Sequence, residues 1–246
     1  MTGTRRVVDL CRKLTKLKAL VHVSTAYCNI QKDDIEERVY RDTDDPVKLI
    51  EAAEWMSDEL LASMEPALFN GRPSGYHYTK ALAERLLDDH HDLPVAIVRP
   101  SMITAAWREP VAGWTDSRHG LAGYYLSALA GVLRTHRAKG EIVFDMVPVD
   151  IVANSCICAS LAVVGTDHRP MVINCTTGSL NPIIWRSVRD LSAPIMVKYP
   201  SVQTWRAPCT RFHTSPLLHR LDQLLEHTIP AWLADFLLQL TGHAPV

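Results

Sequence analysis

The sequence of 246 residues lacks the marks of several protein classes. It has no basic excess, with 26 lysines and arginines against 27 acidic residues, which argues against a nucleic-acid-binding domain. A net charge of −1 and 47% hydrophobic residues exclude an intrinsically disordered chain. No stretch reaches the roughly 18 apolar residues that a membrane-spanning helix needs. We therefore expect a globular protein that is soluble, or at most peripheral to a membrane.

Paired cysteines and metal-ligand clusters are also missing. The six cysteines contain no Cys-x-x-Cys pair, which is typical of reduced intracellular thiols rather than of a disulfide framework. His90, His91 and Asp92 are adjacent, so their side chains point apart on a helix end, and no second cluster completes a site. We expect a reducing compartment and no bound metal ion.

What is present is an alternation of helices and buried strands. Apolar residues recur at helical spacing over 5–14, which predicts a helix close to the first residue. The apolar runs at 19–23 and 95–98 do not alternate with polar residues, which favours strands covered on both faces. The long segment between them favours a parallel crossover over a hairpin. The pattern predicts an α/β fold with a doubly wound parallel sheet.

Further elements extend this rhythm and then weaken it. We expect helices over 46–64, 76–91, 121–136 and 150–164, and strands over 142–147 and 171–174. Beyond residue 181, prolines and tryptophans punctuate the chain. We therefore predict a Rossmann-like domain over 1–178 and a small, mostly helical segment over 179–246. The apolar face at 228–240 is expected to pack on its own domain, with contact to a membrane surface as the alternative.

Tyr76 and Lys80 form a Tyr-x-x-x-Lys pattern at the start of a predicted helix. Four residues span about one helical turn, so both side chains lie on one face. A nearby ammonium favours the phenolate and lowers the pKa of a tyrosine, which makes it a usable general acid. A solvated surface pair is the alternative interpretation of these two residues alone.

Their position in the chain favours chemistry over a surface pair. Ser24 and Thr25 follow the first buried strand, at the carboxyl edge of a parallel sheet where α/β proteins bind ligands. Tyr76 and Lys80 open the helix that leads into the next strand. These hydroxyl and amine groups are therefore expected to converge at one edge of the sheet.

Five ordered motifs resemble one family. They are the segments 21–29, 54–56, 76–84, 98–105 and 147–150. In order and spacing they look like the fatty acyl-CoA reductases, which belong to the extended short-chain dehydrogenase/reductase superfamily. The similarity covers nearly the whole chain. The resemblance implies a partial Rossmann-like fold, which corresponds to the second half of the fold of that superfamily. It also implies an enzyme that uses NADPH to reduce a long-chain acyl-CoA to a fatty alcohol through an aldehyde.

The resemblance also implies roles for individual residues. Tyr76 would protonate the substrate carbonyl oxygen, and Lys80 would lower the pKa of Tyr76 and bind the nicotinamide ribose. Thr25, in preference to its neighbour Ser24, would donate a further hydrogen bond to that oxygen. The remaining cofactor contacts would come from the segment with Pro100, Ser101 and Ile103, where Pro100 is expected to end a strand and leave backbone amides exposed toward the nicotinamide.

The sequence departs from the family at both ends. No Gly-x-Gly-x-x-Gly or Gly-x-x-Gly-x-x-Gly turn is present to hold a pyrophosphate. We therefore expect an internal piece of a longer reductase, truncated at both termini, with poor affinity for NADPH by itself. For the full-length form the resemblance implies the cytosolic face of a peroxisomal or endoplasmic-reticulum membrane, peripheral membrane contact through the C-terminal region, and a homodimer.

Two other functions remain open on the sequence. A sterol dehydrogenase or a sugar-nucleotide epimerase would share the Tyr-Lys pair, although the segments 25–27 and 55–56 argue against both. A catalytically inactive relic that binds lipid or dimerises would keep the fold without the reaction.

Overall fold

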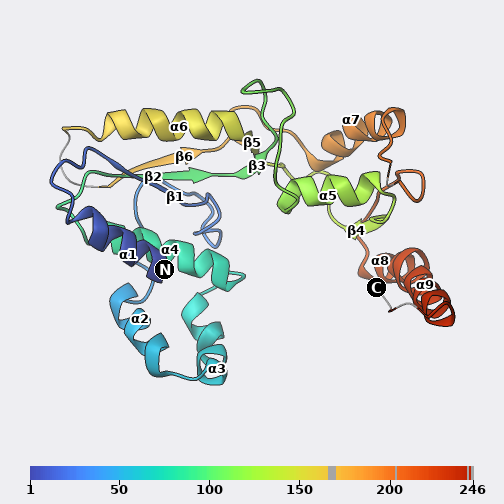
Figure 1. Ribbon diagram of the computed structural model, residues 1–246, viewed down its shortest axis with the longest axis horizontal. Helices are drawn as coiled ribbons and strands as arrows, with labels where there is room; N and C mark the ends of the chain where they lie inside the picture. The colour runs from blue at the N-terminus through green and yellow to red at the C-terminus, as the bar shows by residue number, and fades with distance from the viewer. Residues whose placement is uncertain (166–169, 203, 243, 245–246) are drawn as a thin grey trace. The chain divides into compact units, whose positions relative to one another are not determined.

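The computed structural model describes residues 1–165, 170–202, 204–242 and 244, which form two compact units (Figure 1). Unit 1 consists of residues 1–114 and 146–177, and unit 2 of residues 115–145 and 178–246. We predicted a domain boundary after residue 178, and the chain leaves unit 1 for the last time after residue 177. The segment 115–145, which we expected in the first domain, groups with the second unit.

Unit 1 is an α/β unit, which confirms the predicted fold class. Its helices are α1 (Thr2–Cys11), α2 (Pro46–Trp55), α3 (Asp58–Phe69), α4 (Gly75–Asp88) and α6 (Val149–Ala162). Its strands are β1 (Leu20–Val23), β2 (Val95–Pro100), β3 (Met102–Thr104), β5 (Met146–Pro148) and β6 (Met171–Cys175).

A parallel sheet in the order β1-β2-β6 forms the centre of unit 1. Leu20 pairs with Val95 at one end of β1, and Val23 pairs with Val98 at the other. The central strand β2 is buried along its whole length, as expected for a strand covered on both faces. A second, short parallel pair joins β3 to β5 and continues the chain beyond the end of β2.

The two faces of the sheet pack against different helices. On one face, Val95 and Ile97 of β2 join a core with Val8 of α1 and Leu87 of α4. On the other face, Ala96 and Val98 belong to a core that includes Ala159 of α6. Successive residues of a strand point to opposite faces, so one apolar run serves both cores. Figure 1 shows α1 and α4 on one side of these strands and α6 on the other.

The predicted helix over 46–64 is two helices, which corrects that expectation. α2 ends at Trp55 because Met56 adopts an extended conformation (φ −75°, ψ 144°). Ser57 then caps α3, with its hydroxyl accepting a hydrogen bond from the Leu60 amide at 3.3 Å. Side-chain capping of this kind satisfies an amide that has no partner within the helix.

Unit 2 is mostly helical. It contains α5 (Gly120–Leu129), α7 (Trp185–Lys198), α8 (Pro216–Gln223), the π-helical turn η1 (Leu224–Thr228) and α9 (Ile229–Leu240). Its two short strands, β4 (Thr135–Arg137) and β7 (Arg211–His213), pair in parallel.

Three expectations for the chain beyond residue 115 are wrong. α5 ends at Leu129 rather than at residue 136, and Gly131 then turns the chain with φ +71°. The strand expected over 142–147 is shorter and later, since β5 is Met146–Pro148. The apolar face of α9 does not pack on its own domain within the described residues: Trp232, Phe236 and neighbouring leucines are more than half exposed. No helix in the described ranges has the length and hydrophobicity needed to cross a membrane.

Candidate active site

Lys80 is fixed at the carboxyl end of β1. Its ammonium nitrogen donates a hydrogen bond to the carbonyl oxygen of Val23 at 2.9 Å. Val23 is the last residue of β1, so α4 and the edge of the sheet meet at this contact. Lys80 therefore reaches the end of the first strand, directly before Ser24 and Thr25.

Tyr76 lies one turn before Lys80 on α4. The helix starts at Gly75, after Ser74, whose hydroxyl is hydrogen-bonded to the imidazole Nδ1 of His77 at 2.8 Å. The ring of Tyr76 meets that of His77 edge-on, with 5.4 Å between ring centroids. Tyr76 is 55% exposed.

Ser24 and Thr25 are buried directly after β1. The amide of Ser24 extends the sheet by donating to the Val98 carbonyl at 2.8 Å. The hydroxyl oxygen of Thr25 accepts a hydrogen bond from the Tyr27 amide at 3.3 Å. Because a hydroxyl that accepts in this way still has its own hydrogen to give, the turn leaves Thr25 as a donor. The Ser24 hydroxyl is also buried and has no hydrogen-bond partner within the described residues. Burial raises the pKa of the nearby Cys28 thiol to about 12.

Pro100 and Ser101 end the neighbouring strand at the same edge. The Pro100 carbonyl accepts a hydrogen bond from the Ala26 amide at 2.9 Å, which ties the segments after β1 and β2 together. The amide of Ser101 donates to the Cys175 carbonyl at 3.1 Å. This amide is therefore not exposed toward a cofactor, contrary to our expectation for the segment. Ile103 lies further on, in β3, and is 43% exposed.

A buried ion pair behind the edge was missed by the sequence analysis. Arg99 and Glu84 are at most 1% exposed, and their side chains meet at 2.6 Å. The guanidinium also donates to the carbonyls of Glu36 and Arg38. Since Glu84 follows Lys80 by one turn of α4, the pair fixes the helix against β2. A signal was available, because Arg99 is a charged residue within an otherwise apolar strand.

A second buried arginine holds the segment that follows β1. Arg72 is fully buried at its side chain and pairs with Asp42 at 2.9 Å. Its guanidinium also donates to the Cys28 carbonyl and to the side-chain oxygen of Asn29, both at 2.9 Å. Beyond the backbone bond of Ala26, the side chain of Arg72 thus anchors the segment that follows β1.

His22 adds an uncharged imidazole near Lys80. Burial, helped by the positive charge of Lys80, lowers the pKa of His22 to about 4. At neutral pH this ring therefore carries no charge, and Lys80 is the cation beside the end of β1. No group of three or more metal-ligating side chains gathers within the described part of the chain.

Comparison with known families assigns the chain to a family. A model of a family of NAD-binding domains, described as male sterility protein, matches residues 1–156. The chain belongs to this family. The matched range contains Ser24, Thr25, Tyr76, Lys80 and Ser101.

Curated reductases are similar to this chain in sequence, which confirms the resemblance. The chain is 40% identical over 245 residues to fatty acyl-CoA reductase 1 of Xenopus laevis and 41% identical to that of Rattus norvegicus. Each alignment covers 99% of this chain and 48% of the relative. Fatty acyl-CoA reductase 2 of Mus musculus is 34% identical over 249 residues, with 100% and 48% covered. The chain thus spans about half the length of these relatives.

Solved structures support the fold of this chain. The reductase domain of a nonribosomal peptide synthetase from Mycobacterium tuberculosis matches with a TM-score of 0.57 and 20% identity, over 99% of this chain and 53% of that one. UDP-glucuronic acid 4-epimerase from Bacillus cereus, in complex with NAD, matches with a TM-score of 0.51 and 15% identity, over 87% and 54%. Reductases and epimerases share this fold, so the fold alone does not choose between them.

The residues at the edge fit the nicotinamide end of the dinucleotide that this family binds. The Ser101 hydroxyl is buried at the edge and has no hydrogen-bond partner within the described residues. The Lys80 ammonium has three protons, and its bond to Val23 uses one of them. Both residues therefore have donors left for ribose hydroxyls or a carboxamide.

Proposed function

We propose that this chain forms the catalytic part of an NADPH-dependent reductase that converts long-chain fatty acyl-CoA to fatty alcohol through an aldehyde. The observation that carries the proposal is the contact of Lys80 with the end of β1, one helical turn after Tyr76 and next to Thr25. The reductase names of relatives at about 40% identity support this substrate. The epimerase alternative has support from fold likeness alone.

Each residue has a defined task in this proposal. Tyr76 donates its phenolic proton to the carbonyl oxygen of the substrate as negative charge develops there. Lys80 stabilises the phenolate that remains, since an opposite charge nearby favours the ionised form. Thr25, whose oxygen is held by the Tyr27 amide, donates a hydrogen bond to the same oxygen. Bound reduced nicotinamide would supply one hydride in each of two rounds, of which the first releases coenzyme A as its thiol and gives the aldehyde and the second gives the alcohol. Ser101 would help to hold the carboxamide of the cofactor.

The decisive experiment replaces Tyr76 by phenylalanine in the protein that carries this sequence. With palmitoyl-CoA and NADPH we expect formation of hexadecanol to fall by at least about 100-fold, the lower end of what general acid catalysis contributes. Tyr199→Phe is the matched control, because Tyr199 is also exposed but lies outside the edge of the sheet. Alcohol production that survives Tyr76→Phe would remove Tyr76 from the mechanism.

The choice of cofactor is tested separately. The same protein is titrated with NADPH and with NADH, and the fluorescence of the reduced nicotinamide is followed. Tighter binding of NADPH supports the proposal, and equal or tighter binding of NADH contradicts it. Lys80→Met should weaken the binding of either cofactor, because the ribose loses its cationic donor.

We also propose peripheral contact with a membrane through α9, at the cytosolic face of peroxisomes or the endoplasmic reticulum. Support comes from its exposed apolar side chains: Trp232, Leu233, Phe236, Leu237 and Leu240 are between 58% and 68% exposed. Flotation with phosphatidylcholine vesicles tests the contact, and Phe236→Asp should reduce it. Fractionation of cells tests the location.

A further inference from the structure

Unit 2 contains an apolar pocket of about 410 Å³. This volume lies within the roughly 300–1,000 Å³ that small-molecule sites occupy. Carbon-rich side chains make up most of its wall, namely Tyr124, Leu133, Ala138, Ile142, Phe144 and Trp185. They come from α5, from the N-terminal end of α7 and from the chain around β4, so elements distant in sequence build one concave surface.

Two polar atoms of the wall bond each other, while Nδ1 of His136 is buried and has no hydrogen-bond partner within the described residues. The indole nitrogen of Trp185 donates a hydrogen bond to Nε2 of His136 at 2.9 Å. An indole can only donate, so Nε2 is the accepting nitrogen and the neutral ring carries its proton on Nδ1, which is out of contact with solvent. Burial lowers the pKa of His136, which keeps the ring neutral. The pocket therefore presents mainly carbon.

Aromatic packing fixes the wall in place. The ring of Trp185 lies 4.2 Å from that of Phe144 and 5.2 Å from that of Tyr124, measured between centroids. It stacks on Phe212 with an interplanar angle of 5°. Rings held on several sides do not have to reorganise when a ligand enters, which reduces the entropic cost of binding.

One charged residue lines the pocket. Lys139 is exposed, so its ammonium group faces water while its stem contributes to the wall. A carbon-lined pocket with a cation beside it suits a ligand that has a long apolar part and an anionic end.

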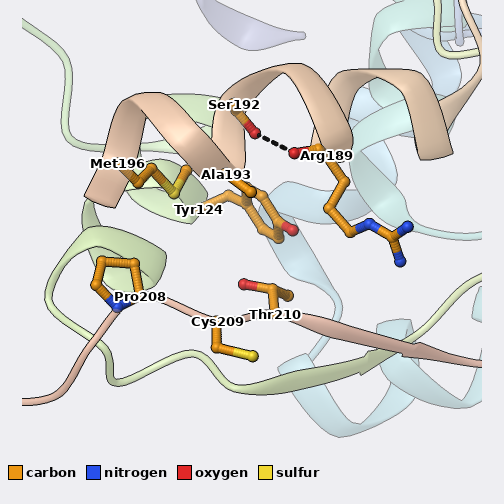
Figure 2. Close-up of a pocket in the computed structure, with 8 residues that line it drawn as sticks. All are labelled: Tyr124, Arg189, Ser192, Ala193, Met196, Pro208, Cys209 and Thr210. Atoms are coloured by element: carbon orange, nitrogen blue, oxygen red, sulfur yellow. Dashed lines mark hydrogen bonds between the residues drawn. The ribbon is translucent and has the colours of Figure 1, made fainter. Parts of the chain in front are cut away.

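A neighbouring pocket in unit 2 differs in size and in chemistry (Figure 2). It measures about 190 Å³ and shares Tyr124 with the first pocket, but Arg189, Ser192 and Cys209 give it polar groups. The Ser192 hydroxyl donates to the Arg189 carbonyl at 3.0 Å, which Figure 2 shows as a dashed line. This smaller pocket does not suit a hydrocarbon chain, and it provides matched control positions.

We infer that the 410 Å³ pocket binds the hydrocarbon chain of a fatty acyl ligand. The identity of that ligand as the substrate rests on the proposed function. The pocket itself is argued from its carbon lining, its rigid aromatic wall and Lys139, and it can be tested without turnover.

Quenching of tryptophan fluorescence tests this inference. Bromine quenches an indole only near contact, so 12-bromododecanoate is added to the full chain below its micellar concentration. We expect saturable quenching that disappears in Trp185→Phe and persists in Trp205→Phe, whose tryptophan lies outside the pocket. Quenching that persists in Trp185→Phe and disappears in Trp232→Phe would place the ligand on α9 and overturn the inference.

Filling the pocket provides the second test. Ala138→Phe should weaken binding of 12-bromododecanoate by at least about tenfold, since hydrophobic pockets discriminate by that factor for small changes in fit. Ala193→Phe, the same change in the smaller pocket, should leave binding unchanged. Equal affinity of Ala138→Phe and the unmodified chain would overturn the inference. If circular dichroism shows that Ala138→Phe does not fold, Ala138→Leu replaces it with the same expected direction.

These measurements separate the inference from the proposed function. Quenching at Trp185 together with absent reductase activity would leave the pocket assigned and refute the proposed reaction. Reductase activity without quenching at Trp185 would refute the pocket and leave the reaction. Each result therefore refutes either the assignment of the pocket or the proposed reaction, and leaves the other in place.

Discussion

Replacing Arg99 by methionine should cost unit 1 about 3 to 5 kcal/mol of unfolding free energy, the range for breaking a buried ion pair. Arg99 and Glu84 are almost completely buried. The guanidinium makes two hydrogen bonds to the carboxylate, at 2.9 and 2.6 Å, and two to the carbonyls of Glu36 and Arg38, at 2.9 and 2.8 Å. Methionine removes all four and leaves an unpaired carboxylate in the core.

The partner variant should cost less. Glu84→Gln preserves the shape of the side chain and an oxygen acceptor, and the guanidinium keeps its two carbonyl partners. We expect a loss near the lower end of the range, about 3 kcal/mol. The double variant Arg99→Met with Glu84→Leu buries no unpaired charge. It should therefore be more stable than Arg99→Met alone, because a buried pair and an apolar replacement are often close in free energy.

Urea denaturation followed by circular dichroism measures these differences, with the transitions of the two units fitted separately. Glu51→Gln is the control, since Glu51 is an exposed glutamate of α2 and its loss should change stability by no more than about 0.5 kcal/mol. A double variant that is no more stable than Arg99→Met alone would show that the unpaired carboxylate is not the cause of the loss, and would refute the reasoning.

Three further predictions follow from single residues. The pKa of His22 is lowered from 6.5 to about 4, so the folded state resists protonation. The contribution of His22 to the free energy of unfolding is therefore complete above pH 6.5 and falls by about 3 kcal/mol toward pH 4. His22→Gln should remove that part of the loss in urea titrations. Asp150 accepts hydrogen bonds from the amides of 107–109, so Asp150→Ala should speed hydrogen exchange there and nowhere else in unit 1. Gly131→Ala should lower the melting temperature more than Gly113→Ala, because both have positive φ but a Cβ at Gly131 would lie 2.1 Å from a carbonyl oxygen; equal shifts would contradict the clash.

Local sequence patterns predicted most helices and strands of unit 1. The apolar run at 95–98 predicted a strand covered on both faces, and β2 is the buried central strand of the sheet. The four-residue spacing of Tyr76 and Lys80 predicted one helical face, and both residues lie on α4. These predictions succeeded because periodicity and spacing depend on neighbours in the sequence.

Features that depend on distant segments could not be predicted in this way. β4 forms because Thr135 pairs with Arg211, and no local pattern distinguishes it from the end of a helix. The grouping of 115–145 with the later part of the chain is equally non-local. The break between α2 and α3 was readable in principle, since Ser57 followed by acidic residues is a helix-start signal.

Some features of the candidate site could be predicted from local sequence, and others depend on distant segments. The hydroxyls after β1 and the Tyr-Lys pair follow from the topology of parallel strands, whose carboxyl ends share an edge. The contact of the Ser101 amide with Cys175 depends on β6, which lies far along the chain, so the expected free amide could not be checked from the sequence. The same holds for the buried contact between Arg99 and Glu84, which joins a strand to a helix.

The interleaving of the two units constrains how the polypeptide is made and cut. The chain passes from one unit to the other after residues 114, 145 and 177. During synthesis, β2 must wait for β6 before its second edge is covered, and the residues of unit 2 between them emerge first. After a protease cuts one connection between the units, one unit still consists of segments from both fragments. The cut protein should therefore stay associated until a denaturant is added.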